Sequence, residues 1–414
     1  MAGHLSFIST FTRDARIIIL SNAVRSFVQA LLAVAFPIYL SKIGAQPVVV
    51  GIAFMGIGLF SAVRSLIEGI VADRLGRKPV LLFISATLVA GGVIFYITTN
   101  LAVLLVAAVL FTVGGTITYA PAEVALLSEE AGEGSRTLAL SVNATTATVA
   151  AILGNLAAAL PEALQRLGFP EVYAYQQIFV LLTGAGVLSF ILFAMLRDIE
   201  PEHVKEEKAT LSEEEMGERR LLVRWSGVVA LDQIGGSFNN LISYWYYLRF
   251  GVGPAEIGLV TGAGRLIATI SFALGFRMAR RLGTISATAL SRVPIFLINA
   301  ITPLMPSFGV VAAGRLVMSV FSDIDVPLRQ SYIMGVTRSK VRASAYGVVQ
   351  VVSRFTSAGA PAVTGYLYEF VSLSIPFYGA ALFQAASAGS MYFIFKDIKP
   401  PEERLAREQG PGKE

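Results

Sequence analysis

The sequence contains no cysteine and only two histidines, His4 and His203. Without cysteine there are no disulfides, no thiolate metal ligands and no cysteine nucleophiles. Both histidines lie outside the long apolar segments, so a buried histidine proton relay is excluded as well. A group that exchanges protons within those segments must then be an Asp, a Glu or a basic residue. We expect neither a cofactor nor a bound metal.

Charge is also scarce, because 15% of the 414 residues are charged, 55% are hydrophobic and the mean hydropathy is +0.67. Soluble domains carry about 25% charged residues, so this chain cannot cover a water-facing surface of matching size. A membrane helix needs about 20 apolar residues, so twelve crossings would use about 240 residues and leave short loops. The apolar runs are continuous rather than alternating, which excludes a membrane β-barrel. The sequence predicts an all-α membrane protein with 12 transmembrane helices.

Apolar runs and turn signals divide the chain into two sets of six predicted spans. A first six-helix bundle is expected over 1–196 and a second over 223–398. A glutamate-rich cytoplasmic linker over 197–222 joins them, and a cytoplasmic tail follows over 399–414. The spans are expected near 16–40, 47–72, 79–98, 101–126, 136–160, 174–196, 223–248, 255–279, 285–305, 308–333, 342–367 and 374–396.

The basic residues indicate how the chain is oriented in the membrane. With both termini placed inside, 23 of the 33 Lys and Arg residues fall in inner loops and tails and 3 in outer loops. Lys and Arg collect in cytoplasmic loops, so we expect a multi-pass protein of the cell membrane with both termini cytoplasmic. The same rule explains the net charge of +5, and nucleic acid is not expected as a partner. The other 7 basic residues lie within predicted spans: Arg25, Arg64, Arg265, Arg292, Arg315, Arg329 and Arg354.

An internal repeat supports the division into halves. Near-constant offsets of 206 and 207 residues relate two series of Gly, Pro, Tyr and basic positions. Such halves are parallel copies related by an axis along the membrane normal, and substrates bind near the midplane between the copies. The matched residues are Tyr39, Lys42, Gly44, Pro47, Gly51, Gly69, Arg74, Pro121 and Arg136 with Tyr246, Arg249, Gly251, Pro254, Gly258, Gly275, Arg280, Pro327 and Arg342.

The loop between the second and third spans carries a compact motif of six residues: Gly69, Asp73, Arg74, Gly76, Arg77 and Lys78. Gly69 would let another helix approach closely, and Asp73 can face the positive end of a neighbouring helix. Gly76 permits a tight turn. Arg77 can reach an acidic residue of another loop, for which the candidates are Glu129, Glu130 and Glu133.

This loop resembles the signature G-x-x-x-D-R-x-G-R-R/K of the major facilitator superfamily, in the position expected for it. The resemblance implies a fold of two pseudo-symmetric six-helix bundles, and a latch between Asp73 and the eleventh span that closes the cytoplasmic side. In the second half Ala279 stands where Asp73 would fall, so the halves are not expected to gate identically. Val109, in place of an Arg, and Gly154-Asn155, in place of Gly-Pro, depart from the superfamily's drug–proton antiporters. The subgroup is therefore not identified.

Ionisable residues inside a membrane cost about 2.5–3.5 kcal/mol at a helix centre on insertion scales, so they are functional candidates. Arg25 in the first span and Asp232 in the seventh occupy equivalent repeat positions. These spans face each other in the superfamily fold, so the two residues either pair or bind oppositely charged parts of a substrate. A structural ion pair without a substrate role is the alternative. Gln29 shares a helix face with Arg25, and Asn239 shares one with Asp232.

The tenth span contains four charged residues, Arg315, Asp323, Asp325 and Arg329. Asp325 and Arg329 have the favoured acid-first i, i+4 order and can satisfy each other. Asp323 has no basic residue three or four positions away, which makes it the better candidate for reversible protonation; neutralisation by Arg315 or Arg354 is the alternative. Arg265 and Arg354 add positive charge. An anionic substrate follows if these arginines converge, because Arg binds carboxylates bidentately.

These features predict a secondary active transporter, not an enzyme, that works by rocking-bundle alternating access. The sequence has no Gly-rich ATP-binding motif, so transport is expected to use an ion or solute gradient. The first interpretation is proton-linked export of small organic or amphipathic compounds. The alternatives are transport of an anionic organic solute bound by membrane arginines, and a transport-inactive receptor or lipid scramblase. The expected partners are the lipid bilayer, a small-molecule substrate and a proton or another coupling ion, with the protein acting as a monomer.

Overall fold

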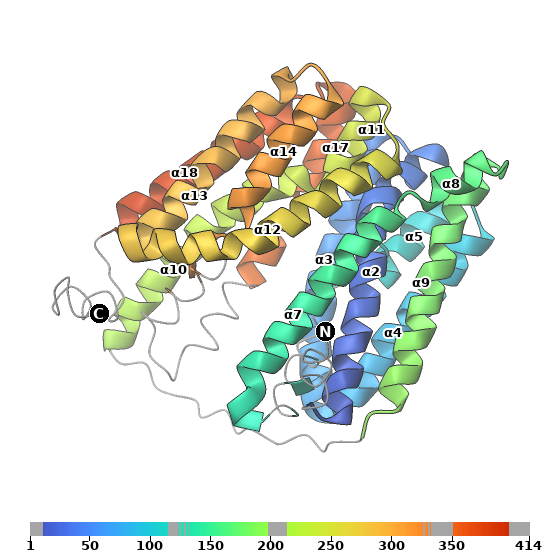
Figure 1. Cartoon of the computed structure of the whole chain (residues 1–414), viewed down its shortest axis with the longest axis horizontal. Coiled ribbons are helices and arrows are strands. Elements are labelled where there is room, and N and C mark those ends of the chain that lie inside the picture. Colours follow the sequence, from blue (N-terminus) through green and yellow to red (C-terminus); the bar gives the residue numbers. More distant parts are fainter. Residues whose placement is uncertain are drawn as a thin grey trace, which may run out of the picture. The chain divides into compact units, whose positions relative to one another are not determined.

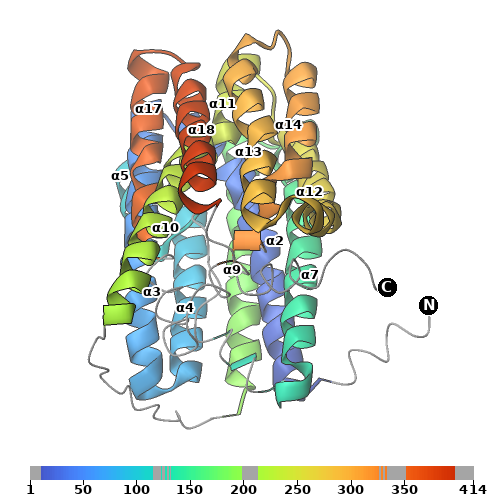
Figure 2. The same cartoon turned by 90° about the vertical axis from the view of Figure 1, so that its left-hand side faces the viewer.

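The described part of the chain is helical and contains no strand in the computed structural model (Figures 1 and 2). The described residues are 11–114, 123, 126–127, 130, 132–197, 213–325, 328–329, 332 and 351–396. Their α-helices are α2 (Arg13–Lys42), α3 (Pro47–Leu75), α4 (Arg77–Ile97), α5 (Leu101–Phe111), α7 (Gly132–Ala157), α8 (Leu160–Arg166), α9 (Glu171–Ala194), α10 (Glu213–Ser237), α11 (Ile242–Phe250), α12 (Pro254–Leu282), α13 (Thr284–Ile301), α14 (Phe308–Ser322), α17 (Ala360–Phe370) and α18 (Ile375–Phe395). Two short 3-10 helices are η1 (Phe238–Leu241) and η2 (Thr302–Leu304).

Within the described residues, six helical segments are long and apolar enough to cross a membrane. They are Arg13–Lys42, Pro47–Ala72, Arg77–Ile97, Leu138–Arg166, Glu171–Ala194 and Thr284–Leu304. The prediction of an all-helical membrane protein is confirmed, and the total of 12 spans stays a prediction.

The helices end where local sequence favours it. Asn100 caps α5, because its side-chain oxygen accepts a hydrogen bond from the Val103 N–H at 3.2 Å. Gly76 separates α3 from α4 with a φ of 90°, a left-handed conformation that favours glycine. Gly283 separates α12 from α13 with a φ of 82°, at the equivalent position of the second repeat. The tight turn expected at Gly76 is present and recurs in the second repeat.

The chain forms two compact units whose boundaries differ from the division of the sequence into repeats. The first unit contains residues 1–206 and 243–262, and the second contains 207–242 and 263–414. A short segment of the second repeat, 243–262, therefore packs with the first. The division of the sequence into two six-helix bundles rests on the repeat and stays a prediction. The two compact units are described separately below.

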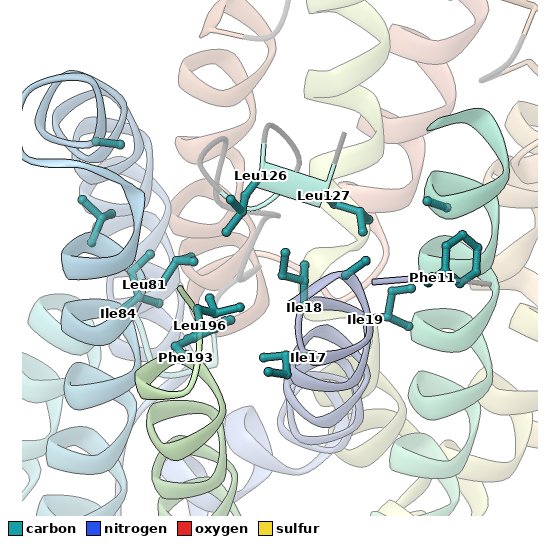
Figure 3. Packing of buried hydrophobic residues seen from close by; sticks show 14 residues of the cluster. Phe11, Ile17, Ile18, Ile19, Leu81, Ile84, Leu126, Leu127, Phe193 and Leu196 are labelled. Atoms are coloured by element: carbon teal, nitrogen blue, oxygen red, sulfur yellow. The ribbon is translucent and has the colours of Figure 1, made fainter. Parts of the chain in front are cut away.

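In the first unit α2 packs along α7 and α9, and α4 packs along α9 (Figures 1 and 2). The approach of α2 to α7 depends on Gly154, where a Cβ atom would lie 2.0 Å from the Phe27 carbonyl oxygen. A buried apolar cluster joins the beginning of α2 to the end of α9, with Ile18 and Phe193 at its centre (Figure 3). These contacts hold the first, fifth and sixth predicted spans together.

In the second unit α18 packs along α10 and α13, and α13 packs against α14. An aromatic cluster ties the middle of α10 to the end of α18. The rings of Trp225 and Tyr332 stack with centroids 4.8 Å apart, and Phe395 meets Trp225 edge-on at 5.1 Å. All three side chains are buried. The cluster fixes residue 332 of the tenth predicted span against two other helices.

The segment 243–262 is held in the first unit by a helix cap and by a close backbone approach. The Ala255 N–H, in the first turn of α12, donates a hydrogen bond to Glu162 Oε1 at 2.9 Å. A negative carboxylate is favourable at the positive N-terminal end of a helix. At Gly258, one turn later, a Cβ atom would lie 2.0 Å from the Asn155 carbonyl oxygen. Glycine at this position is therefore required for the contact between α12 and α7.

Candidate functional site

The first unit contains a buried ion pair between Arg25 of α2 and Glu123. Nη2 of Arg25 donates to both carboxylate oxygens of Glu123, and the two side chains are 3% and 1% exposed. The guanidinium also lies 5.5 Å from the ring centroid of Phe193. Beside the pair, Asn22 donates a hydrogen bond to the Asn143 side chain at 3.0 Å. The pair is electrically neutral and links the first predicted span to the fourth.

The second unit contains four charges in one buried cluster. Arg292 of α13 contacts both Asp232 of α10, at 2.8 Å, and Asp325. Arg329 contacts the same two carboxylates, at 2.9 Å from Asp232 and 2.8 Å from Asp325. The four side chains are between 0% and 18% exposed. Two Asp and two Arg give no net charge, which is how a low-dielectric interior tolerates ions.

Both carboxylates of this cluster use only one of their two oxygens. Oδ2 of Asp232 and Oδ2 of Asp325 each receive two arginine contacts. Oδ1 of each is buried without a hydrogen-bond partner within the described part of the chain. The i, i+4 pairing expected for Asp325 and Arg329 is present.

The two ion clusters occupy equivalent positions of the internal repeat with their signs reversed. Arg25 corresponds to Asp232 at an offset of 207, and Glu123 corresponds to Arg329 at an offset of 206. The expectation that Arg25 and Asp232 either pair with each other or bind a substrate overlooked these partners. Each is instead bound to oppositely charged residues of its own unit, because each repeat closes its first and fourth spans by itself.

Arg315 of α14 is held by groups that carry no charge. Its Nη2 donates to the Asn239 side-chain oxygen at 2.7 Å, and Nη1 lies 3.4 Å from the Met318 sulfur. Its guanidinium carbon lies 5.7 Å from the ring centroid of Phe377 at the beginning of α18. Asn239 lies in η1, the 3-10 segment between α10 and α11. Arg315 is half-buried and makes no ion pair with a described carboxylate.

Asp323 follows α14 directly and is also half-buried. It forms no hydrogen bond or ion pair with any residue that the structure describes, so the alternative of neutralisation by Arg315 or Arg354 is not seen there. The charges that act on it are those of Asp325, Arg265, Arg292 and Arg329. Arg265 of α12 is exposed and likewise has no ion pair within the described residues.

For the remaining predicted site residues, the structure gives the burial of the side chain or a single contact. Gln29 is half-buried on α2, and Arg354 is half-buried in the helical stretch 351–358. In the motif loop Arg74 is exposed, and Lys78 donates to the Leu196 carbonyl at 2.7 Å. A Cβ atom at Gly69 would meet no atom of the described residues within 4 Å, and the close helix approach expected there stays a prediction.

The predicted latch lies largely outside the described residues. This holds for the Asp73 side chain, for Arg342, for Glu129 and for the Glu133 side chain. Of the acids proposed as partners of Arg77, Glu130 is described, and it accepts a hydrogen bond from the Thr12 hydroxyl at 2.7 Å. The gating role of the loop stays a prediction.

Two residues of the ion clusters were not assigned to a site from the sequence: Glu123 was not singled out, and Arg292 was noted as one of the seven basic residues within predicted spans. A signal for Glu123 was present, because the offset of 206 aligns it with Arg329. No comparable signal existed for Arg292, whose equivalent in the first repeat is Ala86. The pairing of Arg292 depends on the rotation of α13 about its axis, which the sequence pattern does not specify.

A cavity of about 400 Å³ lies in the first unit between α2, α7 and α9. Its lining is apolar throughout, with Phe27, Leu153 and Leu181 among the residues that contribute. Ligand sites need a few placed polar groups to orient a solute. We therefore do not assign the substrate to this cavity.

A repeated bundle of membrane helices with buried charges at equivalent points defines a transporter-like integral membrane protein. The family model of the Major Facilitator Superfamily matches residues 18–310 and 226–413. The chain belongs to the Major Facilitator Superfamily, which confirms the resemblance of the motif loop. It is therefore a multi-pass membrane protein and a secondary transporter rather than an enzyme.

Sequence relatives and solved structures agree with this assignment. The chain is 21% identical over 399 residues to the uncharacterized membrane protein YJR124C of Saccharomyces cerevisiae, covering 86% of this chain and 88% of that one. It is 25% identical over 155 residues to the uncharacterized MFS-type transporter YhcA of Bacillus subtilis, which is 37% of this chain and 29% of YhcA.

Two crystal structures have the same fold. The D-xylose–proton symporter superimposes with a TM-score of 0.70 at 11% identity, covering 92% of this chain and 97% of that one. The nucleoside transporter NupG superimposes with a TM-score of 0.68 at 12% identity, covering 92% and 99%. At this level of identity the likeness shows the fold alone.

Proposed function

We propose that this protein couples the movement of a small organic solute to a proton gradient, and that Asp323 binds and releases the proton. The observation that supports the proposal is the absence of any ion pair to Asp323 among the described residues, although the sequence places it in the tenth predicted span. Asp232 and Asp325 are each bound by two arginines. Protonating either of them would break an ion cluster, whereas Asp323 can change its charge without breaking a described contact.

A proton on Asp323 would act on the cluster through space. Asp323 interacts electrostatically with Arg292 of α13 and with Arg329 of the tenth predicted span. Both arginines form ion pairs with Asp232 of α10. Charge interactions are strong where the surroundings exclude water. The protonation state of Asp323 can therefore favour one packing of these three helices over another, as alternating access requires.

In this proposal the protein works as a monomer in the cell membrane, with both termini in the cytoplasm. Export of organic or amphipathic compounds requires that solute and proton bind in turn, on opposite sides of the membrane. Movement of solute and proton in the same direction requires that they bind together. The order of binding thus decides the direction of transport, and it is measurable.

Proteoliposomes that enclose the pH-sensitive dye pyranine test the proposal. A panel of organic anions, cations and neutral compounds is added outside, and at least one should change the internal pH. The Asp323→Asn variant should lose this pH change, while exchange of the same radiolabelled compound across the membrane continues. Exchange needs substrate binding and reorientation but no net proton movement.

The matched control is Glu256→Gln, which removes an exposed carboxylate at the beginning of α12 and should leave the pH change intact. An Asp323→Asn protein that still moves protons with its solute contradicts the proposal. Lipid movement between leaflets without exchange of any compound in the panel would favour a scramblase instead.

A further inference from the structure

We infer that Arg315 anchors the anionic group of the substrate, and that the substrate is a small organic acid with an apolar ring. This inference rests on the proposed function, because it names the class of solute for the same helix. Three features carry it. They are the uncompensated charge of Arg315, the neutral and aromatic groups around it, and its position relative to Asp323.

The charge of Arg315 is uncompensated, in contrast to the buried arginines of both units. Arg25, Arg292 and Arg329 each form ion pairs with buried carboxylates. Arg315 has no such partner within the described part of the chain, and it lies about two turns after α14 begins. A cation within a membrane span is costly unless an anion or water accompanies it. A substrate anion would provide the missing charge.

The groups around Arg315 fix its guanidinium without neutralising it. The Asn239 oxygen, the Met318 sulfur and the Phe377 ring all contact it, and none carries a charge. Its Nε is buried and has no hydrogen-bond partner among the described residues. A planar guanidinium binds a planar carboxylate through two parallel hydrogen bonds. The adjoining ring of Phe377 favours an apolar ring in the same ligand, because aromatic rings associate beyond their burial alone.

The position of Arg315 places the anion site on the helix face that carries the proton site. Arg315, Ser319 and Asp323 follow one another at intervals of four residues, which puts them on one face about 12 Å long. Ser319 lies against Gly264 of α12, where a Cβ atom would be 2.7 Å from its hydroxyl oxygen. Arg265 follows Gly264 directly in the chain.

This arrangement makes binding of the anion and the proton cooperative. Arg265, Arg315 and Asp323 together carry a net positive charge when Asp323 is ionised, and protonation of Asp323 increases it. A higher positive charge attracts an anion more strongly, and by linkage a bound anion favours protonation by the same factor. Solute and proton are thus expected to bind together and to move in the same direction.

The test uses three naphthalene compounds that carry an anionic, a neutral or a cationic substituent at the same ring position: 1-naphthoate, 1-naphthylmethanol and 1-naphthylmethylamine. Each is titrated into the purified full-length protein, and the shift in thermal unfolding is followed. 1-Naphthoate should stabilise the protein, and the other two should not. Arg315→Gln should raise the half-saturating naphthoate concentration about 10-fold or more, as expected for loss of a charge-assisted hydrogen bond. Arg315→Lys keeps the charge but not the planar guanidinium, so its affinity for naphthoate should lie between that of the unchanged protein and that of Arg315→Gln.

The matched control is Arg281→Gln, which removes an exposed arginine near the end of α12 and should not change naphthoate affinity. Size-exclusion profiles identify variants that fail to fold. If Arg315→Gln fails to fold, Arg315→Lys is used in its place. Three results would overturn the inference: no stabilisation by naphthoate, equal stabilisation by the uncharged or cationic compound, or unchanged affinity in both Arg315 variants.

The outcome is separable from that of the proposed function. Naphthoate binding is measured in detergent without a gradient, and it requires no proton movement. Binding that depends on Arg315 together with normal proton coupling in Asp323→Asn would retain the anion site and reject Asp323 as the coupling residue. Loss of coupling in Asp323→Asn without naphthoate binding would do the reverse.

Discussion

The two repeats place an ion cluster at the same point with opposite signs and unequal size. At that point the first unit has the pair of Arg25 with Glu123, and the second has Asp232 with Arg329 joined by two further charges. Reversing the sign of a neutral pair keeps its net charge at zero, so either sign serves to hold the first span of a repeat to its fourth. The link is thus common to both repeats.

The added charges distinguish the second repeat from the first. At the positions equivalent to Arg292, Arg315 and Asp323 the first repeat has Ala86, Val109 and Ile117. Within the predicted spans, Arg265, Arg315 and Asp323 form no ion pair with a described residue, and all three lie in the second repeat. This difference teaches that the first repeat supplies a scaffold, whereas the second holds the proposed substrate and proton sites.

The largest effect is expected from breaking the pair of the first unit. Arg25→Ala leaves Glu123 buried and unpaired, which should lower the free energy of unfolding by about 3–5 kcal/mol. Denaturant titration in mixed micelles measures the change. The double variant Arg25→Glu with Glu123→Arg copies the polarity of the second repeat and should recover most of the loss. A double variant as unstable as Arg25→Ala would show that the two signs are not interchangeable.

A second effect is expected from giving the first repeat the unpaired arginine of the second. Val109→Arg places a charge where the Val109 side chain packs against Gly56. A Cβ atom at Gly56 would already lie 2.9 Å from Cγ2 of Val109. The first repeat has Leu32 at the position of Asn239, so no polar group holds the new side chain. We expect destabilisation of about 2.5–3.5 kcal/mol. Val109→Met, of similar length but uncharged, is the control, and equal losses in both would assign the effect to size.

The smallest effect is expected from removing one acid of the larger cluster. In Asp232→Asn both Arg292 and Arg329 keep their contacts with Asp325, so we expect a loss of about 1–3 kcal/mol. Glu123→Gln, measured in the same titration, removes the one acidic partner that Arg25 has among the described residues and should cost more. An equal or larger loss in Asp232→Asn would mean that the four charges do not share their partners as the contacts indicate.

The sequence sufficed for the family, the helical class and the local pairings. The spacing of Asp325 and Arg329 predicts their contact, because residues four apart on a helix are neighbours. The left-handed turn at Gly76 was likewise readable, since glycine followed by a helix start is a local signal. Such features depend on a few adjacent residues, and tertiary packing need not be known.

Contacts between distant helices were predicted less well. Arg25 was matched with Asp232 because the repeat aligns them, yet alignment in a repeat makes two residues equivalent rather than adjacent. The support of Arg315 by Asn239 depends on the 3-10 segment η1, where the helix changes its winding and shifts the side chains that follow. Neither effect has a signature in apolar periodicity.

Helix α12 begins in the first unit and ends in the second. Its 29 residues form a rod about 43 Å long, and Glu162 holds its first turn. The boundary between the units falls between Gly262 and Ala263, and Gly264 follows Ala263. Two glycines in three residues weaken a helix at that point. The pair of glycines and the contact between Glu162 and the Ala255 N–H are therefore two separate points on α12 whose contributions can be tested one at a time.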